Sequence, residues 1–127
     1  MEIVRRMWEM WSAGDVEGVA SLVSLDVDCF PAAGELTPKR FRGREAFLNY
    51  AKEWMADFSE YALEAGEFHD VGDCVIVVGR VVGRGRGSGA EVSADDAWLY
   101  RLEDGLVIEY RECGTKAEAL EAAGLRE

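Results

Sequence analysis

Glu112, an acid near the end of the chain, stands out as a group that could do chemistry. It lies in residues 106–113, which we predict to form a strand, and the two-residue period of a strand places it on the same face as Ile108 and Tyr110. Val107 falls on the opposite face, which also carries an acid and a base, so we expect the face of Glu112 to be buried. A carboxylate turned into an apolar interior is costly unless it has a partner or a chemical role. Glu112 is therefore a candidate acid/base group.

Asp96 is the second candidate. It lies in a predicted strand over residues 91–102, where the same period groups it with Trp98 and Tyr100 on the face that we expect to be buried. Two carboxyl groups in one apolar cavity push their pKa values apart, which can leave one as a neutral hydrogen-bond donor and the other as an ionised base. Such a pair suits removal of a proton next to a carbonyl, or activation of a water. The alternative is that Asp96 is exposed at the start of its strand and Glu112 pairs with an arginine at the rim.

Aromatic and thioether side chains recur along the predicted elements, and they form either a core or the walls of a cavity. A curved sheet closed by helices commonly leaves an apolar cavity that binds a flat ligand. On that interpretation the sequence predicts a site for a small hydrophobic molecule. The candidate ligand-binding residues are Met7, Trp11, Phe30, Trp54, Phe58, Trp98, Tyr100 and Tyr110.

The elements that must position these residues follow from the periodicity of the apolar side chains. Apolar residues at helical spacing predict helices over residues 2–13, over residues 16–23 with Val23 on the buried stripe, and over residues 44–58. A capping box at Thr115 predicts a last helix that ends near residue 124. Strands are expected over residues 26–30, 61–68, 74–84, 91–102 and 106–113, with a loop over residues 32–42. Helices followed by a meander of strands indicate an α+β fold, with a curved antiparallel sheet wrapped over helices.

Composition limits the classes of function. The 127 residues suffice for one domain, residues 1–127, and a formal net charge of −11 argues against nucleic acid and against anionic membranes as partners. No apolar run approaches the length of a membrane span, so we expect a soluble protein of the cytoplasm. Cys29, Cys74 and Cys113 have no C-x-x-C spacing and are expected to be buried free thiols. His69 is the only histidine, and we expect neither a metal site nor a cofactor.

Several local sequences, spread over nearly the whole chain, resemble the SnoaL-like branch of the nuclear-transport-factor-two-like superfamily, which also contains ketosteroid isomerase. The resemblance implies a conical α+β barrel with three N-terminal helices, a short C-terminal helix and one pocket, and a homodimer formed through the convex face of the sheet. It also implies that Glu112 is a general base and that Asp96 donates a hydrogen bond to a developing oxyanion. The matching segments are residues 12–15, 41–46, 79–89, 102–105 and 118–125.

The chain also departs from ketosteroid isomerase. Met7 stands where that enzyme has its oxyanion tyrosine, and Phe30 or Pro31 stands where it has its base, so we do not expect steroid isomerisation by the usual residues. Two hypotheses remain. The first is a cofactor-free acid/base enzyme of the isomerase, cyclase or lyase type that removes a proton next to a carbonyl. The second is a non-catalytic ligand-binding or dimeric interaction domain.

Overall fold

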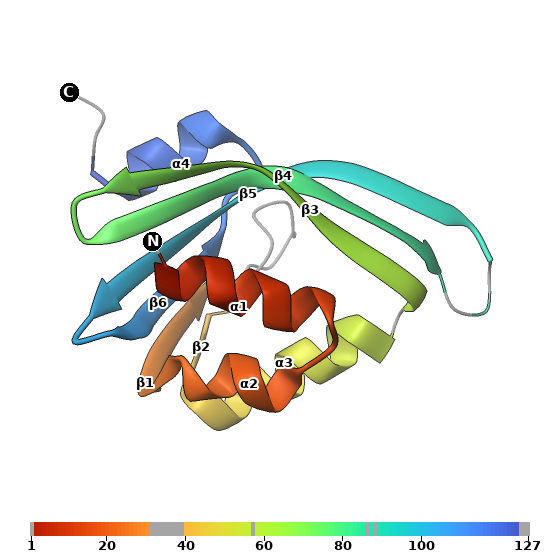
Figure 1. The fold of residues 1–127 in the computed structure, drawn as a ribbon, viewed down its shortest axis with the longest axis horizontal. Coiled ribbons are helices and arrows are strands. Elements are labelled where there is room, and N and C mark those ends of the chain that lie inside the picture. Colours follow the sequence, from red (N-terminus) through yellow and green to blue (C-terminus); the bar gives the residue numbers. More distant parts are fainter. Residues whose placement is uncertain (1, 31–39, 57, 86, 88, 125–127) are drawn as a thin grey trace.

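The computed structural model describes residues 2–30, 40–56, 58–85, 87 and 89–124, and it confirms the α+β class. Three helices and two strands open the chain, four long strands follow, and a short helix closes it (Figure 1). The described helices are each too short or too polar to cross a lipid bilayer. The elements are α1 (Glu2–Ser12), α2 (Val16–Ser21), β1 (Val23–Phe30), β2 (Phe41–Arg42), α3 (Arg44–Ala56), β3 (Phe58–Val71), β4 (Cys74–Gly85), β5 (Glu91–Glu103), β6 (Leu106–Glu112) and α4 (Lys116–Ala122).

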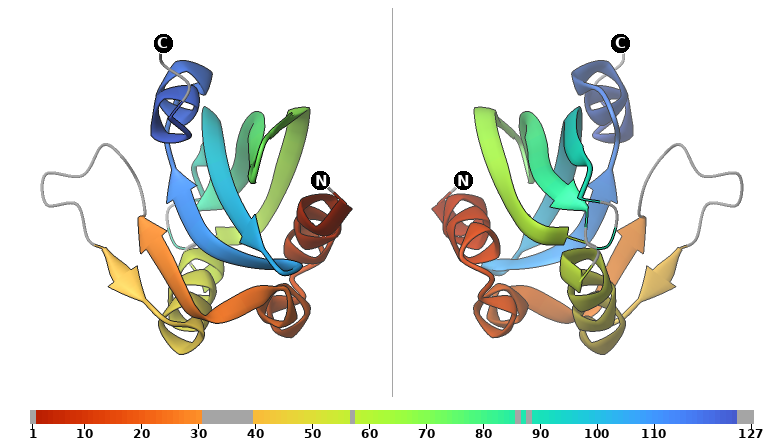
Figure 2. Two further views of the ribbon diagram at one scale, coloured as in Figure 1. Left: turned by 90° about the vertical axis from the view of Figure 1, so that its left-hand side faces the viewer. Right: turned by 90° about the vertical axis from the view of Figure 1, so that its right-hand side faces the viewer.

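The six strands form one curved sheet in the order β2-β1-β6-β5-β4-β3. All neighbouring strands are antiparallel except β1 and β6, which run parallel. Helices α1, α2 and α3 lie on the concave side of the sheet and α4 lies on the other side, as both views of Figure 2 show. The sheet therefore has two covered faces, an inner one toward α1–α3 and an outer one partly covered by α4.

Alternation along β5 separates these two faces. Trp98 and Tyr100 belong to the main core under α1–α3, as the sequence predicts. Ala97 and Leu99 point the other way and are fully buried in a second cluster with Ala119 of α4. The second face of β5 is therefore apolar because α4 covers it, whereas the sequence analysis treats that face as the more exposed one.

Three element boundaries differ from the prediction. Val23 is not on the stripe of the second helix, because α2 ends at Ser21 and Val23 begins β1, where it pairs with Val107. Phe58 does not end α3 but begins β3, where pairing with the long strand β4 extends the predicted strand at both ends. Of the predicted loop, residues 32–39 lie outside the described residues, and Phe41–Arg42 is the short strand β2.

A β-bulge in β6 changes which side chains of that strand point toward the core. Arg101 pairs with Glu109 and Leu102 pairs with Val107, so Ile108 is an extra residue in β6. The two-residue alternation is therefore reset at Ile108, and Val107 lies in the main core with 1% of its surface exposed. The prediction that Val107 faces away from the core is wrong for this reason.

Candidate functional site

The candidate site is built on the cross-strand pairs of β5 and β6. Glu112 lies opposite Trp98, and Tyr110 lies opposite Tyr100, in antiparallel register. Side chains of directly opposed residues share one face of a sheet and are close neighbours. The pairing therefore brings the acid of β6 beside the aromatic residues of β5, on the inner face of the sheet.

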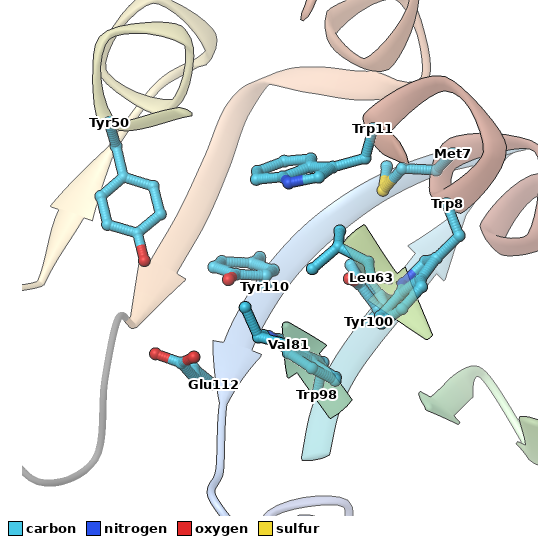
Figure 3. Close-up of a pocket in the computed structure, with 10 residues that line it drawn as sticks. All are labelled: Met7, Trp8, Trp11, Tyr50, Leu63, Val81, Trp98, Tyr100, Tyr110 and Glu112. Carbon is cyan, nitrogen blue, oxygen red and sulfur yellow. Dashed lines mark hydrogen bonds between the residues drawn. The ribbon is translucent and has the colours of Figure 1, made fainter. Parts of the chain in front are cut away.

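These side chains and others from α1, α3, β3 and β4 enclose a narrow cavity, which we call the chamber (Figure 3). The space open to the centre of a water molecule within it is about 30 Å³. If that space is roughly spherical, adding the ~1.4 Å radius of a water gives a hollow about 3 Å in radius, which is slightly smaller than a six-membered ring. The chamber is lined by Met7, Trp8, Trp11, Tyr50, Leu63, Val81, Trp98, Tyr100, Tyr110 and Glu112.

The aromatic walls are locked together by specific contacts. The indole Nε1–H of Trp8 donates a hydrogen bond of 3.0 Å to the Tyr100 hydroxyl, and both residues are buried. Trp8 also packs edge-on against Trp98, with ring centroids 4.9 Å apart. The rings of Tyr100 and Tyr110 are 5.7 Å apart. Since the Tyr100 oxygen receives the indole N–H, the hydroxyl can still donate its own proton to a ligand atom.

Charge and burial act together on the two tyrosines. Burial is the main cause that raises the pKa of Tyr100. The Trp8 hydrogen bond opposes this rise in pKa, and the negative charges of Glu112 and Asp96 add smaller increases. Burial likewise raises the pKa of Tyr110, and contributions from Tyr50, Tyr100 and Glu112 add to it. Both hydroxyls therefore stay protonated at neutral pH and can act as hydrogen-bond donors.

Glu112 is half-buried at one end of the chamber, and Figure 3 shows its carboxylate on the side toward which the Tyr50 hydroxyl points. Among the described residues that line the chamber, Glu112 is the only carboxylate. The other described walls of the chamber are aromatic, aliphatic or thioether side chains and phenolic hydroxyls. The structure thus places this predicted site residue together with Met7, Trp11, Trp98, Tyr100 and Tyr110, five of the predicted ligand-binding residues.

Asp96 has a different position. Its carboxylate accepts hydrogen bonds from the backbone N–H of Ala97 at 2.8 Å and of Gly114 at 3.0 Å, so it holds the chain where it leaves β6. Asp96 does not line the chamber, although its charge reaches Tyr100. The two acids that the sequence analysis pairs are therefore not both walls of one cavity.

Three predicted ligand-binding residues are not among the described walls. Phe30 lies at the end of β1 beneath the guanidinium of Arg111, which is 3.8 Å from the ring centroid. Phe58, at the start of β3, packs against Tyr61 with ring centroids 6.4 Å apart. Trp54 is part of α3, but its side chain lies outside the described part of the structure.

Four chamber residues are missing from the predicted site. Trp8 is adjacent to Met7 on the apolar stripe of α1, and it belongs to the aromatic residues predicted to form either a core or the walls of a cavity, but not to the candidate ligand-binding residues. Tyr50 follows Phe47 by three residues in α3, so helical spacing could have found it. Leu63 and Val81 are pairing partners on β3 and β4 and point inward with the strand alternation.

The described residues hold no group of three or more His, Cys, Asp or Glu side chains that could bind a metal ion. The cysteine prediction is confirmed, because Cys29, Cys74 and Cys113 are buried and free. Burial raises the pKa of the Cys29 thiol to about 12, and those of Cys74 and Cys113 to about 11.

A family model described as a SnoaL-like domain matches residues 4–110, which is most of the chain. This chain belongs to the SnoaL-like family. The matched segment contains nine of the ten chamber residues and ends two residues before Glu112. No curated protein sequence matches this SnoaL-like chain.

Solved structures confirm the fold of the SnoaL-like chain. A protein with a ketosteroid isomerase-like fold from Catenulispora acidiphila, in complex with trimethylamine, is 18% identical, with a TM-score of 0.79 over 98% of this chain and 93% of that one. TerC co-crystallised with polyporic acid is 18% identical, with a TM-score of 0.77 over 94% of each chain. A candidate SnoaL-like polyketide cyclase from a Jannaschia species is 21% identical, with a TM-score of 0.79 over 99% of this chain and 91% of that one.

Proposed function

We propose that this chain binds a small, mostly apolar molecule in the chamber and uses Glu112 to remove a proton from a carbon next to a carbonyl group. The observation that carries the proposal is the position of Glu112 as the only carboxylate among the described chamber walls, beside hydroxyl donors held in place by packing. A base in an apolar cavity and a preorganised donor for the developing oxyanion are the two groups that enolisation requires. Neither group needs a metal or an organic cofactor.

In the proposed step the Glu112 carboxylate takes the proton from the carbon. The electrons of the broken C–H bond form a carbon–carbon double bond, and the carbonyl electrons move to oxygen. The Tyr100 hydroxyl is placed to donate to that oxygen, because its lone pair already receives the Trp8 N–H and its raised pKa keeps it protonated. Return of the proton from Glu112 to the same or another carbon completes an exchange or an isomerisation.

The similar structures support a site for small molecules. The Catenulispora relative holds trimethylamine and TerC holds polyporic acid, and the Jannaschia relative is a candidate polyketide cyclase. A chamber about 3 Å in radius is close to the size of one ring of a carbonyl compound, and a small outward shift of the side chains around it admits that ring. The non-catalytic alternative differs only in that Glu112 would hold the ligand and exchange no proton with it.

Deuterium exchange at the α-carbons of cyclohexanone in D₂O, followed by proton NMR, tests the proposal. We expect the protein to accelerate exchange, and Glu112→Gln to lower the rate by about 10²–10⁴-fold, as for loss of a general base. Glu109→Gln is the matched control, since Glu109 is on the same strand but forms ion pairs with Arg101 and Arg111. Binding of cyclohexanone with no acceleration would support the non-catalytic alternative and refute the catalytic role of Glu112.

We also propose that the chain forms a homodimer through the outer face of β3, β4 and β5, as the family resemblance implies. On this face half-buried Val82 lies between two exposed ion pairs, Arg80–Asp95 at 3.1 Å and Arg84–Glu91 at 3.0 Å. Exposed ion pairs of this kind contribute little to the stability of the fold, so exchanging their partners for those of a second copy costs the fold little.

A further inference from the structure

An open groove between α1 and β3 adjoins the chamber, and the side chains of Trp8 and Leu63 line both spaces. The groove has a volume of about 570 Å³ and is open to solvent. Only these two side chains line both spaces among the described walls, so together they form the partition. We call this space the outer groove, which is also lined by Arg5, Glu9, Ala65 and Phe68.

The partition has one fixed side chain, Trp8, and one that can move without unfolding a strand, Leu63. Trp8 is held by one side-chain hydrogen bond, to Tyr100, and by edge-on contacts with Trp98 and with Phe68, whose ring centroid is 6.4 Å away. Leu63 is half-buried on β3, the edge strand of the sheet. A small rotation of Leu63 would therefore join the two hollows while Trp8 keeps its hydrogen bond to Tyr100.

The floor of the outer groove is apolar because of a β-bulge. Leu63 and Ala65 point to the inner face of β3 by alternation, and the register with β4 then shifts between Ala65 and Glu67. The extra residue, Gly66, resets the alternation and brings Phe68 to the same side as Leu63 and Ala65. The result is a continuous apolar strip that leads away from the chamber.

Polar groups lie at the margin of this strip. The guanidinium of Arg5 covers the Phe68 ring at 4.2 Å from its centroid, and Glu9 lies on the same face of α1, one turn further along. An apolar strip with a polar margin fits an alkyl chain better than a charged group. The shape and chemistry thus continue those of the chamber.

We infer that the chamber and the outer groove form one two-part site for an elongated molecule, with a ring in the chamber and an alkyl chain that passes Trp8 and Leu63 into the outer groove. This inference rests on the proposed function, because the ring end is the part that meets Glu112. It gives the ligand class as an aromatic or cyclic carbonyl compound that carries an apolar chain. The small size of the chamber is then explained, since it has to hold only one ring of the ligand.

Calorimetric titration with a series of 4-alkylphenols, from 4-methylphenol to 4-hexylphenol, tests the inference, because the phenol hydroxyl can donate to Glu112 and only the chain length varies. We expect the affinity to rise about two- to fourfold for each added methylene, as apolar surface enters the outer groove. Ala65→Glu places a carboxylate in the groove and is expected to abolish the rise for the longer phenols while leaving 4-methylphenol unaffected. Leu25→Glu is the matched control, because Leu25 is 69% exposed on β1 and lines neither the chamber nor the outer groove.

The outcomes separate the two proposals. An affinity that stays flat or falls with chain length, while 4-methylphenol binds, overturns the two-part site and leaves the proposed function intact. Equal losses in Ala65→Glu and Leu25→Glu would also overturn it, since the effect would then not come from the outer groove. Failure of every phenol to bind contradicts both proposals, because the chamber itself would then accept no ring.

Discussion

The hydrogen bond between Trp8 and Tyr100 allows a quantitative test, because it holds both the partition and the proposed oxyanion donor in place. The distance from the indole Nε1 to the Tyr100 oxygen is 3.0 Å, and the two residues are only 5% and 6% exposed. Tyr100→Phe removes the acceptor and leaves a buried N–H without it, which costs about 1–3 kcal/mol. For a domain of this size we expect a lower melting temperature by roughly 4 °C per kcal/mol.

A double-mutant cycle isolates the hydrogen bond from other effects. Trp8→Phe loses the bond and also part of the buried indole surface, so its single cost includes packing. We expect the cost of Trp8→Phe and Tyr100→Phe together to be smaller than the sum of the single costs by about 0.5–1.5 kcal/mol. Urea unfolding followed by far-ultraviolet circular dichroism measures each free energy of unfolding.

The control cycle combines Trp8→Phe with Tyr61→Phe. The Tyr61 hydroxyl donates to the backbone oxygen of Trp11 at 2.7 Å and makes no described hydrogen bond with Trp8. These two changes are therefore expected to add within about 0.5 kcal/mol. A coupling below about 0.3 kcal/mol between Trp8 and Tyr100 would refute the view that this bond holds the chamber wall.

Two further predictions concern the cysteines and the outer face. With pKa values raised to about 12 for Cys29 and about 11 for Cys74 and Cys113, we expect all three thiols of the native protein to react with a disulfide reagent at pH 8 at least 100-fold more slowly than in urea. The thiols of the unfolded chain lose their protons at a lower pH than those of the native protein, so the free energy of unfolding should fall as the pH rises above about 8.5. Native thiols that react as fast as unfolded ones would contradict the prediction of slow reaction. In sedimentation velocity we expect the unmodified protein to be a dimer and Val82→Lys to be a monomer. Leu25→Lys is the control and should remain a dimer, since Leu25 is 69% exposed on β1. A monomeric unmodified protein would refute the proposed dimer.

The sequence predicts the four helices and five of the six strands that the structure describes, the inner face of β5 and the inner face of β6 from Tyr110 onward, because these depend on local periodicity. It predicts that Tyr110 and Glu112 share a face, and both line the chamber. It misplaces Val107, because a bulge inserts one residue and nothing in the local pattern marks Ile108 as that residue. It cannot predict the parallel pairing of β1 with β6, since the two strands are separated by most of the chain.

The candidate site is predicted only in part, and for a similar reason. Periodicity predicts which face of β5 carries Asp96. It does not predict that the backbone N–H of Gly114, eighteen residues later, donates a hydrogen bond to the Asp96 carboxylate. Phe30 is correctly placed in a strand, yet its ring lies under Arg111, which the register of β1 against β6 decides. Long-range register and tertiary contacts, rather than local propensity, therefore determine which aromatic residues enclose the chamber.

The most direct test of the account compares proton exchange and binding in one variant. Glu112→Gln keeps the size of the side chain and removes its basicity, so we expect it to bind cyclohexanone and yet to leave α-deuterium incorporation at the rate of the protein-free solution. The unmodified protein should accelerate incorporation under the same conditions. Acceleration that persists in a ligand-bound Glu112→Gln protein would show that another group moves the proton, and would contradict the central role of Glu112.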